Sequence, residues 1–117
     1  MRVHTWLDRR EVWVALLFLA ALTAGCGAAN NNPALERARE AYQKARQDPE
    51  VAGRAAVALD KAGQTLQQAE RVWKEDNDVT EVEHLAYVAE KRVEIARATA
   101  RRRLAADEIQ KLKFRRD

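Results

Sequence analysis

Serine is absent from this sequence of 117 residues, and cysteine, glycine and proline occur only one, four and two times. The missing serine removes the commonest hydroxyl nucleophile, and a single cysteine cannot form an internal disulfide bond. Neither a glycine-rich phosphate loop nor a paired Cys/His metal pattern is present. The chain is rich in Ala, Glu, Lys, Arg and Gln, a composition typical of long helices and coiled coils. Its length leaves room for one small domain.

The N-terminal part of the chain has the three regions of a secretory signal: a charged start, an apolar run over residues 12–22, and small residues after it. The stretch Leu22 to Cys26, Leu-Thr-Ala-Gly-Cys, resembles the lipobox of bacterial lipoproteins. There the cysteine thiolate is the nucleophile that takes up a diacylglyceryl group. We therefore predict a signal peptide over residues 1–25, cleavage between Gly25 and Cys26, and lipidation (palmitate) of Cys26.

An uncleaved transmembrane anchor is the alternative interpretation of the same region. Residues 12–29 are uncharged and about long enough to span a bilayer core. Both interpretations keep the N-terminus in the cytoplasm and place the residues from about 30 onward beyond the inner membrane. In the lipoproteins that this stretch resembles, an aspartate after the cysteine favours retention in the inner membrane. Because Gly27 stands there, we expect anchoring in the outer membrane facing the periplasm, with inner-membrane anchoring as the alternative.

Cap signals divide the rest of the chain into three expected helices. Asn32-Pro33 and Asp48-Pro49 are start signals, with a capping residue before proline at the first helical position. They predict one helix from Pro33 to Gln47 and a second from Pro49 to about Glu75. Capping boxes at Asp78 and Thr80 predict a third helix over residues 80–112. We expect a tether over residues 26–32, a three-helix domain over 33–113 and a basic tail over 114–117.

Apolar residues recur at spacings of three and four along the second and third expected helices. In the second helix the seam is Ala52, Ala55, Leu59, Ala62, Leu66, Ala69 and Trp73. In the third it is Val82, Ala86, Ala89, Val93, Ala96 and Ala100, extended by Leu104, Ile109 and Leu112. Gly53 and Gly63 are expected to let another helix approach closely. Because short connections make neighbouring helices antiparallel, we predict an all-α, elongated antiparallel hairpin with the first helix packed along it as a three-helix bundle.

Candidate catalytic chemistry is sparse. The pair Glu81 and His84 has the spacing of one di-iron carboxylate motif, which places both side chains on one helix face. Such a site needs a second motif and further glutamates, so an exposed helical histidine is the more ordinary interpretation. We therefore expect no metal, no cofactor and no enzyme activity. Bound iron or manganese would support the alternative.

The one cluster that suggests binding is basic and lies near the C-terminus. Residues 97–117 contain 8 basic and 3 acidic residues. The cluster comprises Arg101, Arg102, Arg103, Lys111, Lys113, Arg115 and Arg116. Such residues can contact an anionic surface, although a solvated helix face is the simpler interpretation. Only Phe114 interleaves them with an aromatic ring, which argues against binding of single-stranded nucleic acid, as does the export signal. We therefore expect no nucleic-acid partner.

The lipobox, the tether and Asn32-Pro33-Ala34 leading into alanine-rich helices resemble a helical domain of unknown function found in Gram-negative outer-membrane lipoproteins. Leu59-Asp60-Lys61-Ala62 and His84-Leu85-Ala86-Tyr87 are similar to that family. In many members the domain precedes an OmpA-like peptidoglycan-binding domain. This sequence ends at Asp117 without one, so that we expect a lone helical module or a truncated product.

We expect a lipid-anchored, non-enzymatic structural or protein-interaction module. Its expected contacts are the membrane, through acyl chains on Cys26, and an envelope protein partner or a second copy. The alternative is a binder of peptidoglycan or another anionic envelope polymer through the basic C-terminal helix.

Overall fold

The computed structural model describes residues 31–117, which form four helices and contain no strand. They are α2 (Pro33–Gln47), α3 (Pro49–Arg54), α4 (Ala56–Glu75) and α5 (Val79–Arg116). The prediction of an all-α fold is confirmed. The predicted signal peptide, the cleavage and lipidation residues Gly25 and Cys26, and all of the tether before Asn31 lie outside the described residues.

Helices α2 and α3 begin where their cap signals predict. The side-chain Oδ1 of Asn32 accepts hydrogen bonds from the backbone N–H groups of Ala34, at 3.0 Å, and Leu35, at 3.2 Å. The side chain of Asp48 accepts one from the backbone N–H of Glu50 at 3.0 Å. Both caps satisfy N–H groups that have no partner within their own helix, which explains the two starts.

The prediction of one continuous helix from Pro49 to Glu75 is wrong, because the chain breaks at Ala55. This residue leaves helical geometry, with φ −132° and ψ 36°, and separates α3 from α4. The break lets α3 turn so that Val51 and Ala55 are both buried. It also leaves the carbonyl oxygen of Arg54 free to accept a hydrogen bond from the guanidinium of Arg103. A contact with distant α5 therefore replaces a local helical bond.

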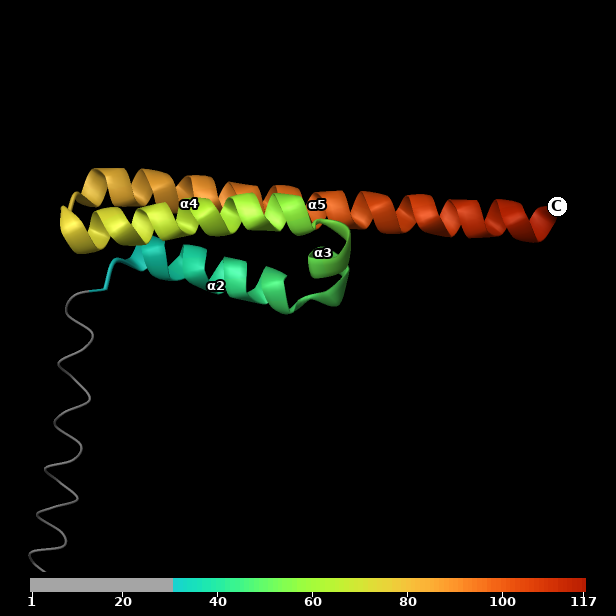
Figure 1. The fold of residues 1–117 in the computed structure, drawn as a ribbon, viewed down its shortest axis with the longest axis horizontal. Helices are drawn as coiled ribbons and strands as arrows, with labels where there is room; N and C mark the ends of the chain where they lie inside the picture. The colour runs from blue at the N-terminus through green and yellow to red at the C-terminus, as the bar shows by residue number, and fades with distance from the viewer. Residues whose placement is uncertain (1–30) are drawn as a thin grey trace, which may run out of the picture. The chain divides into compact units, whose positions relative to one another are not determined.

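The three longer helices pack side by side, with α4 antiparallel to both α2 and α5 (Figure 1). Asp78 caps α5 by accepting a hydrogen bond from the backbone N–H of Glu81 at 3.1 Å, as one of the two predicted capping boxes requires. Before it, Asn77 adopts a left-handed conformation with φ 51°, which asparagine tolerates better than most residues, and closes the turn. The expected three-helix bundle is present, with the short α3 closing one end of it.

Helix α5 is much longer than its partner. It has 38 residues against 20 in α4, or about 57 Å against about 30 Å at 1.5 Å per residue. Its C-terminal part runs on beyond α3 and α4 (Figure 1). The helix was expected to end at Leu112 but continues to Arg116, so residues 114–116 of the expected tail are helical. Basic residues in its last turn interact favourably with the negative end of the helix dipole and support this extension.

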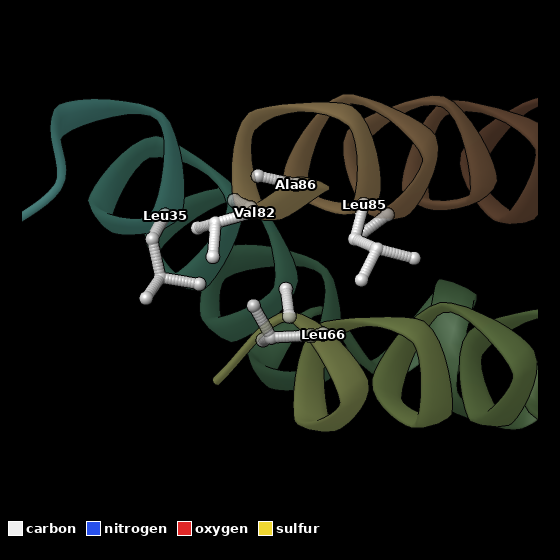
Figure 2. Packing of buried hydrophobic residues seen from close by; sticks show 8 residues of the cluster. Leu35, Leu66, Val82, Leu85 and Ala86 are labelled. Atoms are coloured by element: carbon white, nitrogen blue, oxygen red, sulfur yellow. The ribbon is translucent and has the colours of Figure 1, made fainter. Parts of the chain in front are cut away.

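The core consists of two apolar clusters along the bundle. In the first, Leu35 of α2, Leu66 of α4 and Val82 of α5 point toward one another (Figure 2). The second lies nearer α3 and includes Val51, Leu59 and alanines such as Ala96. Many of the buried side chains are alanine methyl groups, so the helices lie close together while each contact removes little apolar area from water.

Most of the predicted seams are buried, with corrections at both ends. Every predicted position of α5 from Val82 to Ala100 is at most 2% exposed. Ile109 and Leu112 are instead 55% and 63% exposed, and Leu104 is only partly buried. From residue 100 to residue 109 a helix turns through about two and a half revolutions, which places Ile109 opposite the seam. In α3, Ala52 is exposed because the break turns Val51 inward instead.

The two glycines in helices have different environments. A Cβ atom at Gly63 would lie 2.8 Å from the hydroxyl oxygen of Tyr42, so the glycine lets the α2 ring rest on α4. At Gly53 nothing lies within 4 Å of the added atom. The prediction that glycine allows close approach is therefore confirmed for Gly63 and wrong for Gly53.

Candidate functional site

The C-terminal segment of α5, residues 101–116, carries all seven basic residues predicted as a candidate contact surface. All seven are exposed: Arg101, Arg102, Arg103, Lys111, Lys113, Arg115 and Arg116. Successive residues of a helix point in directions about 100° apart, so these side chains surround the helix instead of forming one flat patch. The segment is therefore a collar of basic side chains on the part of α5 that extends beyond the other helices.

Arg54 ties the base of this segment to α3. Its Nε donates to Glu50 at 2.5 Å, and its Nη1 donates to Asp107 of α5. Hydrogen bonds to Glu50, which has the larger effect, and to Asp107 raise the pKa of the Arg54 guanidinium above its usual range. Arg103 of α5 in turn donates a hydrogen bond to the backbone carbonyl of Arg54. One contact between α3 and α5 thus has its donor in α3, and the other has its donor in α5. The sequence shows the Glu50–Arg54 pair, but nothing in it marks Asp107, which lies 53 residues from Arg54.

Arg103 therefore differs from the other basic residues of the segment. Its guanidinium is held by the bundle, whereas the other six make no hydrogen bond or ion pair with any residue of 31–117. Within the C-terminal segment, those six cations remain available to a ligand.

The candidate metal ligands Glu81 and His84 are both exposed in the first turns of α5. The described residues hold no group of three or more His, Cys, Asp or Glu side chains placed to bind a metal ion. The sequence pair is thus a pair of neighbours on a helix face, with no further ligand brought to it from α2 or α4 in residues 31–117.

The polar side chains between helices are satisfied by one another. Arg39 of α2 donates to Glu70 of α4 at 2.7 Å, and this hydrogen bond raises the pKa of Arg39 above its usual range. Arg92 of α5 donates to the hydroxyl of Thr65 at 2.5 Å, and that hydroxyl donates to the Lys61 carbonyl at 3.1 Å. Over residues 31–117, no buried side-chain nitrogen or oxygen lacks a partner. These contacts hold the helices together.

Helices α2 to α5 include none that is both long enough and apolar enough to cross a membrane. This finding concerns residues 31–117 and leaves the apolar run before Cys26 outside it.

The family model "Domain of unknown function (DUF4398)" matches residues 33–112. The chain belongs to this family. The match starts at the first residue of α2 and ends within α5, so the DUF4398 domain comprises the whole bundle and part of the C-terminal segment. The predicted resemblance to a helical domain of unknown function is confirmed at that level. Comparison with curated proteins gave no match, and comparison with solved structures gave none.

Proposed function

We propose that this DUF4398 chain is a lipid-anchored lipoprotein of the bacterial envelope, whose helical domain serves as a non-enzymatic structural or protein-interaction module. The observation that carries the proposal is the sequence Leu-Thr-Ala-Gly-Cys at residues 22–26 after an apolar run. Two or three acyl chains, at about 0.8 kcal/mol per buried CH₂, would hold the mature protein firmly to a bilayer.

The short distance in sequence between Cys26 and the first cap supports this proposal. The domain begins at the capping residue Asn32, so even a fully extended tether reaches only about 20 Å. Such a tether keeps the bundle close to the surface that carries the lipid. Gly27, in place of an aspartate, favours the outer membrane facing the periplasm, with the inner membrane as the alternative.

The anchor is tested by labelling cells that express the full chain with radioactive palmitate and then separating their membranes. We expect the chain to incorporate label, to fractionate with membranes, and to carry acylated Cys26 as its first residue by mass spectrometry. Cys26→Ser should abolish both labelling and cleavage. An unlabelled chain of full length in the membrane fraction would instead support the transmembrane anchor, and a Cys26→Ser chain that still takes up palmitate would refute the lipobox.

The interaction role is tested by crosslinking the tagged full chain in its native envelope and identifying the crosslinked proteins. We expect recovery of an envelope protein or of a second copy of this chain, lost when exposed residues of α5 are changed. A chain that crosslinks to nothing but lipid would contradict the interaction role.

A second function, binding of peptidoglycan or another anionic envelope polymer, is supported by the six available cations of the C-terminal segment. Exposed cations attract anionic polymers with an affinity that falls as salt is added. Isolated peptidoglycan should therefore retain the full chain at low salt, and Arg101→Glu with Arg102→Glu should release it. Reversal of Arg71 and Lys74, two exposed cations of α4, is the matched control. Equal effects of both reversals, or none, would rule out this function.

A further inference from the structure

Helix α5 has a second apolar stripe on the side that faces away from the bundle. This outer stripe consists of Ile95, Ala98, Arg102, Ala105, Ile109 and Leu112, which are all exposed and, apart from Arg102, apolar. Its spacings of 3, 4, 3, 4 and 3 are those of a heptad seam. Three of its members are large apolar side chains with 58%, 55% and 63% of their area exposed, namely Ile95, Ile109 and Leu112.

The position of the outer stripe follows from helix geometry. Its first three members each follow a buried seam position, Val93, Ala96 or Ala100, by two residues. Two residues correspond to a rotation of about 200°, so the stripe lies nearly opposite the packed face. Over residues 95–112 it is about 27 Å long. A long heptad seam with isoleucine and leucine at its ends is suited to another helix of the same kind.

The charges beside the stripe indicate which helix that is. The positions that flank it on one side are Glu94, Arg101, Glu108 and Arg115, and their signs alternate. Lay a second α5 antiparallel on the first, so that Ile95 meets Leu112 of the copy and Ala98 meets Ile109. Glu94 then faces Arg115 of the copy and Arg101 faces Glu108. By symmetry this arrangement makes four pairs of opposite charge along one seam.

Arg102 also fits the antiparallel arrangement. It lies opposite Ala105 of the copy, whose methyl group leaves room for the long side chain to pass and reach water. In a parallel arrangement each Arg102 would face the other Arg102 at the seam, and like charges there are unfavourable. Of the four flanking residues, only Glu108 would then meet an opposite charge, Lys113.

The flanking residues are available for this pairing. Arg101, Glu108 and Arg115 form no ion pair within residues 31–117, and Glu94 pairs only with Lys91 of its own helix, at 3.0 Å. Beyond the stripe, Lys91 would meet Arg116 of the copy and Arg92 would meet Lys113. Like charges thus face each other at both ends, which confines the contact to residues 94–115.

We infer that two copies of this chain associate through the outer stripes of their α5 helices, antiparallel and with Ile95 opposite Leu112. The inference names a partner and a surface for the interaction role, and it does not depend on the lipid anchor. Palmitate labelling can therefore fail while the pairing is upheld, and labelling can succeed while the pairing is refuted.

The register is tested by disulfide crosslinking of two differently tagged full chains expressed together. One copy carries Ala98→Cys and the other Ile109→Cys, and the intact cells are oxidised mildly. We expect a mixed-tag product from this combination. Two copies with Ala98→Cys should give almost none, because antiparallel pairing separates these positions by about 16 Å along the axis. The unchanged chain, whose one cysteine is Cys26, provides the background.

The charge pattern is tested in the same assay. In the Arg101→Glu variant, the new carboxylate faces Glu108 of the copy. Two attractions become two repulsions, so we expect association about tenfold weaker. The double change Arg101→Glu with Glu108→Arg restores both opposite-sign pairs and should restore the crosslink. It also leaves the net charge of the chain unchanged, so recovery cannot come from attraction to an anionic surface. All these positions are exposed, and circular dichroism of each variant should match the parent.

Three outcomes would overturn the inference. The first is a mixed-tag yield no higher than the Cys26 background. The second is efficient Ala98→Cys self-crosslinking, which means parallel pairing. The third is equal loss of crosslink in the single and double charge variants. If the chain stays uncrosslinked and binds vesicles of phosphatidylglycerol, with Ile109→Asp abolishing that binding, then the outer stripe is a lipid-binding face and self-pairing is refuted.

Discussion

The two parts of α5 form one continuous helix but are held in place by different interactions. Residues 79–100 bury one side against α2, α3 and α4, with Val82, Ala86 and Ala96 fully buried. The C-terminal segment, residues 101–116, touches the bundle through Arg103 and Asp107 near its base, where Leu104 is partly buried, and is otherwise exposed.

The comparison shows how a helix can be ordered without a core of its own. Forming the first turn is the costly step, and a short isolated helix is therefore marginal in water. The packed part of α5 already provides that first turn, so the C-terminal segment only has to propagate. Basic residues in its last turn, Lys113, Arg115 and Arg116, add a favourable interaction with the helix dipole. Changes in the packed part should thus alter folding, and changes in the exposed part should alter association.

Leucine truncation should give the largest contrast. Leu35 is 1% exposed and Leu112 is 63% exposed, although both are leucines in helices. We expect Leu35→Ala to lower the free energy of unfolding by about 3 kcal/mol, because it removes buried methyl groups and leaves a cavity. Leu112→Ala should change it by less than about 0.5 kcal/mol. Urea unfolding of the dilute full chain, followed by circular dichroism, measures both. Equal losses would show that the C-terminal segment has a core after all.

Glycine replacement tests the close contact within the packed part. Alanine gains about 1 kcal/mol over glycine in a helix interior, and this gain is shared by both sites. Gly53→Ala has open space around it, so we expect the full stabilisation. At Gly63 the new methyl group meets the Tyr42 ring, so the gain should be cancelled or reversed by about 1 kcal/mol. Combining Gly63→Ala with Tyr42→Ala should remove that penalty relative to Tyr42→Ala alone. A Gly63→Ala protein as stable as Gly53→Ala would contradict the packing described.

Removal of Arg54 tests the boundary between the two parts. Arg54→Ala breaks the contacts with Glu50 and Asp107 that connect α3 to α5. We expect faster hydrogen exchange at the amides of α3, with little change in α4. Arg46→Ala, an exposed arginine of α2, is the control and should leave exchange in α3 as it is. Unchanged exchange in the Arg54 variant would mean that buried Val51 alone holds α3.

Shortening the exposed part should have the smallest effect on folding. Ending the chain after Glu108 removes the last turns of α5 but keeps Asp107 and its contact with Arg54. We expect the free energy of unfolding to change by less than about 0.5 kcal/mol at concentrations where the chain is monomeric. The same variant should lose the proposed self-association, since Ile109 and Leu112 are gone. A large loss of stability would contradict the separation of the two parts.

Local signals in the sequence predicted most of the bundle. Asn32-Pro33, Asp48-Pro49 and Asp78 act within three residues of the helix starts that they mark, so each could be recognised without knowing the fold. The buried seam of α5 was likewise predictable from spacing. The seven basic residues of the C-terminal segment were predicted as a candidate contact surface because they lie close together in the sequence.

The features that sequence did not predict depend on contacts between distant residues. The break at Ala55 accompanies the packing of α3 on α5, and the Arg54–Asp107 pair joins residues far apart in the chain. Ile109 and Leu112 were assigned to the inner seam because apolar residues on either side of a helix satisfy a loose periodicity. Only the lengths of α4 and α5 show that the inner seam loses its partner beyond Ala100, and that these two residues lie on the outer stripe.

The chain enters the bundle at Asn32. This point lies beside the start of α5, since Leu35 near the start of α2 packs with Val82 near the start of α5 (Figure 2). In the proposed antiparallel pair the two entry points therefore lie at opposite ends, roughly 70 Å apart for helices of this length. A pull on both tethers would then load the outer stripes in shear, along the helix axes, so that all their contacts resist the force together. With the proposed lipid anchors in place, the single long helix α5 would thus make the pair a mechanical link between two attachment points on the membrane.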